Sequence, residues 1–298
     1  MIVINLLLVL VFAPLLPGVI NKTKALAAGR VGPPVLQSYY DISKLLRKGS
    51  VISQTTSPIF LIAPAVSFVV ALLAAMMLPL TASPAPISFA GDMIVFVYIF
   101  ALARFFTTAA ALDTGSAFEG MGAAREVTFA CLAEPALFFG LLALARVTGS
   151  LSLSSLLTVA GPVWRESSAA LLLVVASWFV VLLAENSRVP FDDPNTHLEL
   201  TMIHEVMVLD HSGPAFGLVE YASAMKLFVF SALVAHVVLP RPANPMTGAA
   251  LTVVAILVIG VLIGIVESVM ARLRLVRVPQ LLITASLAAG FAVVLVLR

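Results

Sequence analysis

Charged residues are scarce in this sequence: Asp, Glu, Lys and Arg together make up 11% of its 298 residues. A soluble domain of this size carries roughly 25% charged residues and about 45–50% apolar ones. Here 61% of the residues are hydrophobic, and the mean hydropathy is +1.11. The interior of a soluble domain could not hold so many apolar side chains. The composition therefore excludes a soluble globular protein and predicts one that crosses the membrane several times.

Cysteine is almost absent, because Cys131 is the only one in the chain. A single cysteine excludes an internal disulfide and a self-contained thiolate metal or iron–sulfur site, which needs roughly two to four cysteines. The sequence also lacks a GxGxxG or Walker loop and a believable Ser/His/Asp set. We therefore expect no cofactor, no metal and no catalytic residue in this chain. The net charge of +2 indicates no nucleic-acid partner.

Long apolar segments are abundant, and eight of them reach the ~20 residues that a membrane helix needs. They lie at about 2–20, 58–80, 92–112, 128–147, 168–186, 215–238, 249–270 and 280–297. No soluble domain fits between them, so residues 1–298 are predicted to form a single all-α transmembrane domain. The first segment has no charged residues before its apolar core and no small-residue cleavage pattern. We expect it to be a membrane helix rather than a removed signal peptide.

The distribution of Lys and Arg predicts how the chain is oriented in a bacterial or archaeal cytoplasmic membrane. Loops after the first, third, fifth and seventh segments carry eleven basic residues, and the opposite side carries four. Cytoplasmic loops carry the excess of Lys and Arg in membrane proteins. Both termini are therefore predicted to lie outside.

The first cytoplasmic loop contains VLQSYYDISKLLRKG, in which apolar residues recur at helical spacing. Lys44, Arg47 and Lys48 gather at the end of this pattern. We predict an amphipathic helix over 35–48 that lies in the membrane interface with its basic groups near phospholipid heads. The alternative is an ordinary juxtamembrane helix that serves only as an anchor.

Six ionisable residues lie within or at the ends of the apolar segments: Arg104, Glu134, Glu185, Glu220, Lys226 and Glu267. A charge at the centre of a bilayer costs about 2.5–3.5 kcal/mol on insertion scales, so each is a functional candidate. Glu220 and Lys226 are six residues apart on one helix and cannot pair directly. Burial penalises the charged form of a carboxylate and so raises its pKa. A row of buried carboxylates can therefore exchange protons near neutral pH. The alternatives are that some of these groups reach the interface, or that they only form ion pairs with Arg104 or Lys226.

The stretch AENSRVPFDDPNTHLELTMIHEVMVLDHSG, residues 184–213, holds six acidic residues and three histidines. On one straight helix His197, His204 and His211 would stand ~10.5 Å apart in succession, too far to share an ion. HEVMVLDH also misses the HExxH arrangement, because Val208 stands where its second histidine belongs. A titratable face beneath a soluble partner is the favoured interpretation, with a metal site as the alternative.

Four blocks of the sequence resemble subunit 1 of respiratory complex I and, more closely, its homologue in membrane-bound NiFe hydrogenases of the formate hydrogenlyase and hydrogenase-4 kind. The blocks are residues 29–49, 103–135, 185–213 and 267–275. The LDTGSxFxxxGAxRE pattern, from Leu112 to Glu126, favours the hydrogenase branch. Residues 195–213 are rich in histidine, whereas the corresponding loop in that branch has a simpler, acidic sequence.

The resemblance implies an eight-helix anchor that docks the soluble NiFe large subunit and the iron–sulfur small subunit at its cytoplasmic face. It also implies a glutamate-lined path toward antiporter-like membrane subunits, in contact with lipid. The resemblance matches five residues to the path: Glu134, Glu185, Glu199, Asp210 and Glu220. From the ionisable residues of the apolar segments and the loop we add Glu205, Lys226 and Glu267. Residues matched to the docking or quinone-like junction are Arg30, Asp41, Lys44 and Arg125, to which we add Arg188, Asp192 and Asp193.

The function expected from this resemblance is a non-catalytic subunit that couples electron transfer in the partner subunits to proton or Na⁺ movement. The NiFe centre and the iron–sulfur clusters would then belong to those partners. The alternative is a subunit that forms a quinone site, as in a complex I-like NADH dehydrogenase. A free-standing ion transporter is disfavoured because the sequence shows no inverted repeat.

Overall fold

The computed structural model of the protein describes residues 2–53, 55–157, 161–192, 202–240, 242 and 244–297. All regular structure in these ranges is helical, which confirms the predicted all-α class. The elements are α1 (Ile2–Phe12), α2 (Leu15–Ala27), α3 (Gln37–Arg47), α4 (Pro58–Met76), α5 (Asp92–Asp113), α6 (Ala117–Thr148), α7 (Leu153–Leu156), α8 (Gly161–Glu185), η1 (Glu205–Val208), α9 (Gly213–Val238), α10 (Pro245–Val269), η2 (Leu275–Arg277) and α11 (Val278–Val296). The predicted site residues Asp193 and Glu199 lie outside the described ranges.

Eight helices in the described part of the chain are long and apolar enough to cross a membrane, as the sequence predicts. The first of them combines α1 and α2, which are separated by a break at Pro14, a residue with no backbone N–H to donate. α8 has a kink at Ser167, and the predicted segment 168–186 corresponds to the part after this kink. The short helix α7 was not predicted.

The predicted start of the fourth segment at residue 128 is wrong, because α6 already begins at Ala117. Glycines and charged residues lower the hydropathy of 117–127, so this stretch does not look like part of a membrane helix. Tertiary packing decides its structure instead. A Cβ at Gly122 would lie 2.3 Å from Val206 Cγ1, so the absence of a side chain lets the 202–212 segment pack directly on α6.

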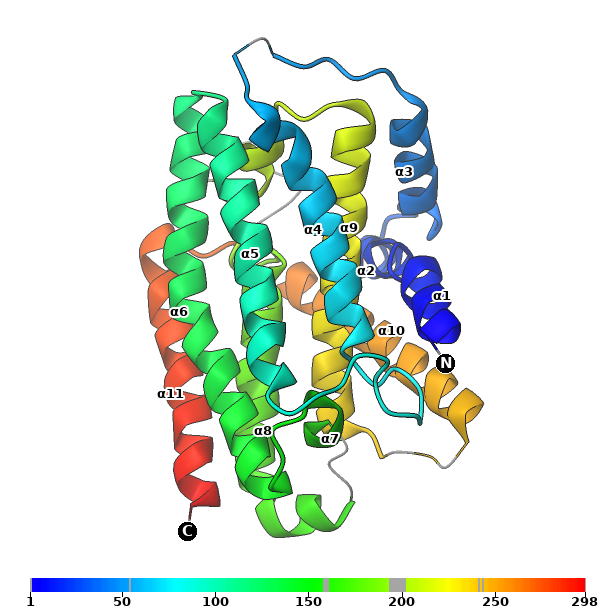
Figure 1. Ribbon diagram of the computed structural model, residues 1–298, viewed down its shortest axis with the longest axis vertical. Helices are drawn as coiled ribbons and strands as arrows, with labels where there is room; N and C mark the ends of the chain where they lie inside the picture. Colours follow the sequence, from blue (N-terminus) through cyan, green and yellow to red (C-terminus); the bar gives the residue numbers. More distant parts are fainter. Residues whose placement is uncertain are drawn as a thin grey trace.

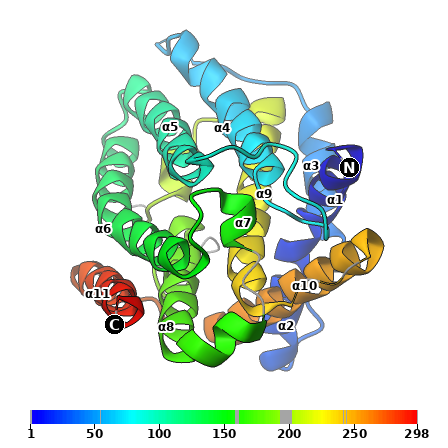
Figure 2. The same cartoon turned by 60° about the horizontal axis from the view of Figure 1, so that its bottom comes forward.

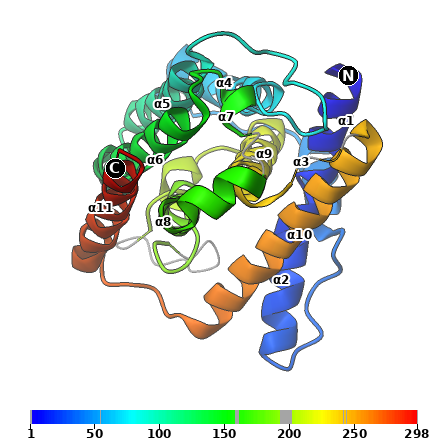
Figure 3. The ribbon, with the colours of Figure 1, turned by 90° about the horizontal axis from the view of Figure 1, so that it is seen from below.

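The helix α9 lies at the centre of the molecule. In its most apolar window 78% of the residues are buried, against at most 44% in every other span. α9 contacts α3, α4, α8 and α10. Figures 2 and 3 show α10 crossing α2 on one side of α9, while α11 packs against α6 on the other side. We call the end formed by residues 48–53, 55–57, 114–116 and 202–212 the loop end; α7 lies toward the opposite end (Figure 1).

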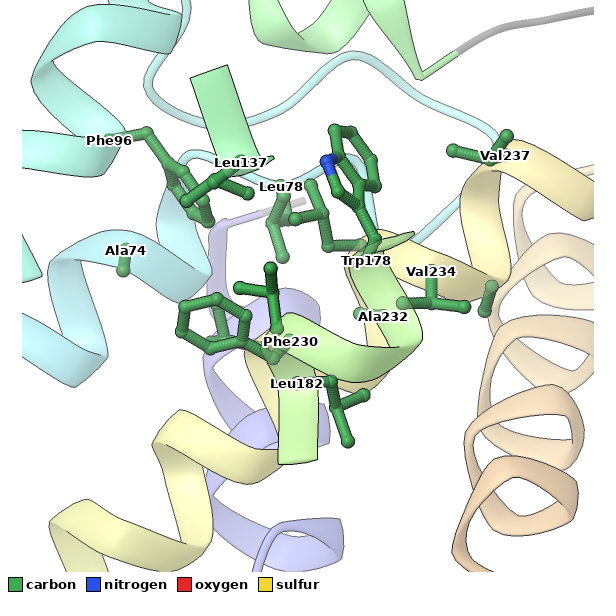
Figure 4. Close-up of a cluster of buried hydrophobic side chains, with 14 of the residues drawn as sticks. Ala74, Leu78, Phe96, Leu137, Trp178, Leu182, Phe230, Ala232, Val234 and Val237 are labelled. Carbon is green, nitrogen blue, oxygen red and sulfur yellow. The ribbon is translucent and has the colours of Figure 1, made fainter. Parts of the chain in front are cut away.

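The main apolar core includes residues of α1, α2, α4 to α6 and α8 to α11. Figure 4 shows one part of it, in which the rings of Phe96, Trp178 and Phe230 lie among smaller side chains and are almost fully buried. A Cβ at Gly140 of α6 would lie 2.1 Å from Trp178 Nε1, so α6 and α8 approach closely because this position is glycine. In a bilayer such close packing and dispersion attraction hold helices together, since lipid tails are as apolar as the side chains.

The amphipathic helix predicted over 35–48 is present as α3. Its buried side faces α9, where Ile42 is buried and Leu45 approaches Gly217. Its outer side exposes Tyr40 together with the basic residues Lys44 and Arg47. The structure therefore confirms the helix, and its contact with lipid stays a prediction.

Candidate functional site

Arg104 on α5 holds together carboxylates from two other helices. Its Nη1 donates to Glu134 Oε1 on α6 at 2.7 Å. Its Nη2 donates to both carboxylate oxygens of Glu185 on α8, at 2.8 and 2.9 Å. A third carboxylate, Glu126 on α6, lies with Oε1 3.8 Å from Arg104 Nε. Lys226 on α9 adds a second cation, with Nζ 2.8 Å from Glu185 Oε2.

These five residues, Arg104, Glu126, Glu134, Glu185 and Lys226, form what we call the central charge cluster. The side chains of Arg104 and Glu185 are only 10% and 6% exposed, whereas that of Glu134 is 32% exposed. Removing charges from water is costly, so such a cluster persists only when each charge has close partners. The bidentate contact between Arg104 and Glu185 is the strongest geometry for such a pair.

Aromatic rings wall the cluster on the side of the apolar core. The Nζ atom of Lys226 lies 6.0 Å from the centroid of Phe100 and 5.9 Å from that of Phe230. A cation at this distance is attracted to the face of an aromatic ring. The rings also exclude water from the pair of Lys226 with Glu185, which strengthens their attraction.

A cavity of about 80 Å³, the inner cavity, borders the cluster and is also lined by His204, Met207 and His211 of the loop end. Its polar lining includes Arg104, Glu126, Glu185, His204, His211 and Lys226. Smaller spaces of about 20 and 10 Å³ border Glu126 with Glu185 and Glu134 with Glu185. A water molecule needs roughly 10–15 Å³ and several polar partners. The cluster therefore has room for several waters on one side and for about one between its carboxylates.

A second group of charges joins α2, α10 and the segment after α8. Glu267 near the end of α10 has Oε2 2.8 Å from Lys24 Nζ and Oε1 3.6 Å from Arg188 Nη1. Glu220 lies on α9, and the charges of Arg188 and Asp41 act on its carboxylate. As predicted, Glu220 and Lys226 do not pair; Lys226 pairs with Glu185.

Asp192, which we added to the docking or quinone-like junction, is almost fully buried. Its side chain is 1% exposed and has Oδ1 2.9 Å from Arg272 Nη2. Its other oxygen accepts the backbone N–H groups of Ile203 and His204, at 2.9 and 3.3 Å. The charge of Asp192 therefore links the segment after α8 to Arg272 and to the backbone of Ile203 and His204.

The remaining predicted residues lie around the loop end. Arg125 Nη1 donates to the carbonyl oxygen of Met202 at 3.0 Å and so ties α6 to the loop. Glu205 is partly buried and Asp210 is exposed. Arg30, Asp41 and Lys44 are exposed on the surface formed by the end of α2 and by α3. The structure thus brings Glu134, Glu185 and Lys226 into one cluster and leaves these other residues outside it.

Two acids near the cluster and the loop end, Glu126 and Glu119, were not among the predicted site residues. Glu126 lies in a stretch that was expected to be a loop. Apart from the GAxRE motif, nothing in the sequence indicated that it joins the central charge cluster. Glu119 is 1% exposed, accepts a hydrogen bond from the Thr114 hydroxyl and accepts the backbone N–H of Asp210 at 3.3 Å. The LDTGSxFxxxGAxRE motif therefore ties the α5–α6 turn to the 202–212 segment.

Both described histidines of the loop are neutral near pH 7. Burial lowers the pKa of His211 to about 4, although the Asp210 carboxylate opposes this effect. Burial also lowers the pKa of His204. Within the described ranges, no three His, Cys, Asp or Glu residues lie close enough together to hold a metal ion.

Comparisons with known proteins place the chain in a family. The sequence model described as NADH dehydrogenase matches residues 1–298. Formate hydrogenlyase subunit 4 of Escherichia coli is 34% identical over 285 residues, which cover 93% of this chain and 92% of that protein. Hydrogenase-4 component C of the same organism is 32% identical over 274 residues, covering 90% and 86%. A subunit of the NADH-quinone oxidoreductase of a Geobacillus species is 25% identical over 221 residues, covering 72% and 65%.

A solved structure shares the fold over the whole chain. A chain of the membrane-bound sulfane sulfur reductase, an archaeal respiratory membrane complex, superposes with a TM-score of 0.86 and 20% identity, covering 99% of both chains. Identity this low supports the fold and nothing further. The match over all 298 residues and the relatives at 34% and 32% identity carry the assignment. The chain is therefore a membrane protein of the NADH dehydrogenase family, to which its resemblance to hydrogenase membrane subunits also pointed.

Proposed function

We propose that this chain is a non-catalytic membrane subunit that docks a soluble hydrogenase arm and couples electron transfer in that arm to proton movement. The observation that carries the proposal is the central charge cluster, which lies inside the membrane domain and borders the inner cavity. The names of the relatives at 34% and 32% identity, formate hydrogenlyase subunit 4 and hydrogenase-4 component C, support a hydrogenase arm as the partner.

The charge balance of the cluster suits proton transfer. Three carboxylates face two cations, so the fully ionised cluster carries one negative charge in excess. Binding one proton makes the cluster neutral, and binding a second makes it positive. A net charge is costly in the membrane interior, so the cluster favours the exchange of a single proton. Both carboxylate oxygens of Glu185 are already engaged by Arg104 or Lys226, which leaves few free oxygen ligands for Na⁺, and we therefore propose protons as the transported ion.

The proposed path runs from the inner cavity through Glu185 to Glu134. Glu185 contacts both cations and borders all three spaces of the cluster. Glu134 is the most exposed carboxylate of the cluster, and it would deliver the proton to an adjoining antiporter-like membrane subunit. Glu267 pairs with Lys24, and Glu220 is influenced by the charges of Arg188 and Asp41. We propose that these two acids lie beside the path and change the electrostatic potential along it.

The loop end is the proposed docking face for the soluble arm. Residues 48–53, 55–57, 114–116 and 202–212 lie together there (Figure 1), and Asp210 is exposed among them. One cysteine is too few to bind an iron–sulfur cluster. We therefore propose that the NiFe centre and the iron–sulfur clusters belong to partner subunits.

A quinone site is the second candidate function. The apolar part of the inner-cavity lining, which includes Val70, Phe100 and Met207, favours it because a quinone ring needs apolar walls with a few polar groups. Quinone that copurifies with the complex, and is displaced by a mutation of Met207 to Arg, would support this candidate over proton passage alone.

Proton movement by the assembled complex tests the main proposal. In sealed vesicles that contain the purified complex, turnover of the soluble arm should change the internal pH, as measured with a pH-sensitive dye. A protonophore should abolish the signal, and replacing Na⁺ by K⁺ should leave it unchanged. Turnover without any pH change in tightly sealed vesicles would contradict the proposal.

Labelling from each side of the membrane tests the proposed orientation. Ser50 and Ala90 are exposed and lie on either side of the spanning helix α4. In a background with Cys131→Ala, a Ser50→Cys variant should react with an impermeant thiol reagent only after the cells are opened. An Ala90→Cys variant should react in intact cells, because eleven basic residues against four place the termini outside. The reverse pattern would invert every loop assignment.

A further inference from the structure

His211 lies between two cavities at the loop end. It follows η1 and precedes α9, and its side chain lines the inner cavity. It also lines a second cavity of about 100 Å³, the outer cavity, whose other lining residues include Ser50, Ile52, Phe60 and Pro214. His211 is the described residue that the two linings share. Any exchange of protons between these two spaces at this point would involve its ring.

The imidazole is held firmly in this position. His211 is 7% exposed, and its ring stacks on Phe60 with centroids 3.9 Å apart and planes inclined by 14°. Phe60 itself is 3% exposed. The stack orients the plane of the imidazole against the Phe60 ring.

One ring nitrogen has no hydrogen-bond partner among the described residues. Nδ1 of His211 is buried and receives no hydrogen bond from the described residues. A buried polar atom of this kind normally has a partner, and water in a neighbouring cavity is the usual one. Because burial lowers the pKa of His211 to about 4, the ring is neutral near pH 7 and has one donor and one acceptor nitrogen.

We propose that His211 relays protons between water in the outer cavity and water in the inner cavity. This inference rests on the proposed coupling function and names its uptake step. The acceptor nitrogen takes a proton from water on one side while the donor nitrogen releases its own proton on the other, so the ring ends neutral. A half-turn of the ring about its Cβ–Cγ bond then presents an acceptor nitrogen to the outer water again, before the next transfer.

The charges around the ring suit this direction of transfer. Asp210, the neighbouring residue, supplies a negative charge on the exposed side. The titratable and charged groups that line the inner cavity with His211 are Arg104, Glu126, Glu185, His204 and Lys226. A proton released into that cavity therefore meets a cluster with one excess negative charge. The relay needs no change of net charge on His211 itself.

A pair of variants separates the relay from a structural role. His211→Phe keeps a planar ring that stacks on Phe60 but cannot carry a proton. Phe60→Leu removes the stack and keeps the imidazole. In assembled complex in vesicles, His211→Phe should lower coupled proton movement at least about tenfold, as the loss of a proton-transfer group typically does. Phe60→Leu should keep most of the movement, and both should keep the turnover of the soluble arm with an artificial electron donor.

Chemical rescue gives a second readout that a structural role would not produce. In His211→Ala, free imidazole added to the medium should enter the space left by the ring and restore proton movement, whereas added benzyl alcohol should not. Normal proton movement in His211→Phe, or failure of imidazole to restore it in the assembled His211→Ala complex, would overturn the relay. If the alanine variant does not assemble, the phenylalanine variant alone decides. Wild-type complex that moves no protons would overturn the proposed function instead.

Discussion

Replacing Arg104 with methionine should leave little assembled protein in the membrane. Arg104 is the partner of Glu134 and Glu185 and lies 3.8 Å from Glu126, so its loss leaves three carboxylates, of which Glu185 is the most buried, facing only Lys226. Breaking a buried ion pair by removing one partner costs about 3–5 kcal/mol, because the remaining charge is left uncompensated. This is a large share of the ~5–15 kcal/mol by which a typical protein is stable.

The measurement is the amount of intact chain in membranes together with its thermal unfolding in detergent, followed by the fluorescence of its two tryptophans. Arg146→Met is the matched control, because Arg146 is exposed in the last turn of α6. The double variant Arg104→Met with Glu185→Gln should recover part of the loss, since it removes one of the stranded charges. Equal stability of Arg104→Met and Arg146→Met would show that the cluster contributes nothing to folding.

Replacing Glu185 with glutamine should uncouple electron transfer from proton movement. Glu185 accepts hydrogen bonds from Arg104 and is paired with Lys226, and it borders the cavities on both sides of the cluster. Glutamine has nearly the same volume but no titrating group, and it changes the charge excess from one negative charge to none. We expect proton movement per electron to fall by about 10²-fold, a typical effect of losing a positioned proton-transfer group.

This variant must be compared at equal assembly, because Glu185 is paired and its neutralisation also weakens the cluster. The measurement is proton movement in vesicles divided by the turnover of the soluble arm, for complex purified by size. Glu220→Gln is the control within the membrane domain, since Glu220 lies outside the cluster and should lower the ratio far less. A ratio for Glu185→Gln equal to that of the wild type would exclude Glu185 from the path.

The membrane spans and the family could be read from the sequence alone. A spanning segment must satisfy all its backbone hydrogen bonds internally, so a run of about 20 apolar residues such as 92–112 has one stable structure whatever surrounds it. The four motif blocks likewise identify the family without any contact being known. The early start of α6 could not be predicted in this way, because the hydropathy of residues 117–127 does not indicate a membrane helix. Their helix is stabilised by tertiary packing, in which Gly122 contacts Val206.

The presence of costly charges was a property of the sequence, but their partners were decided by the tertiary structure. In the sequence, Glu134 lies 30 residues and Glu185 lies 81 residues from Arg104, and the three residues belong to three separate helices. Whether such groups meet depends on how each helix is rotated about its axis and how deep it lies, which side-chain packing sets and local sequence does not. The burial of Asp192 and the position of His211 between two cavities have the same origin. The sequence by itself thus determined eight membrane helices and a set of unusually placed charges, while the packing of those helices decided that five charges form one cluster.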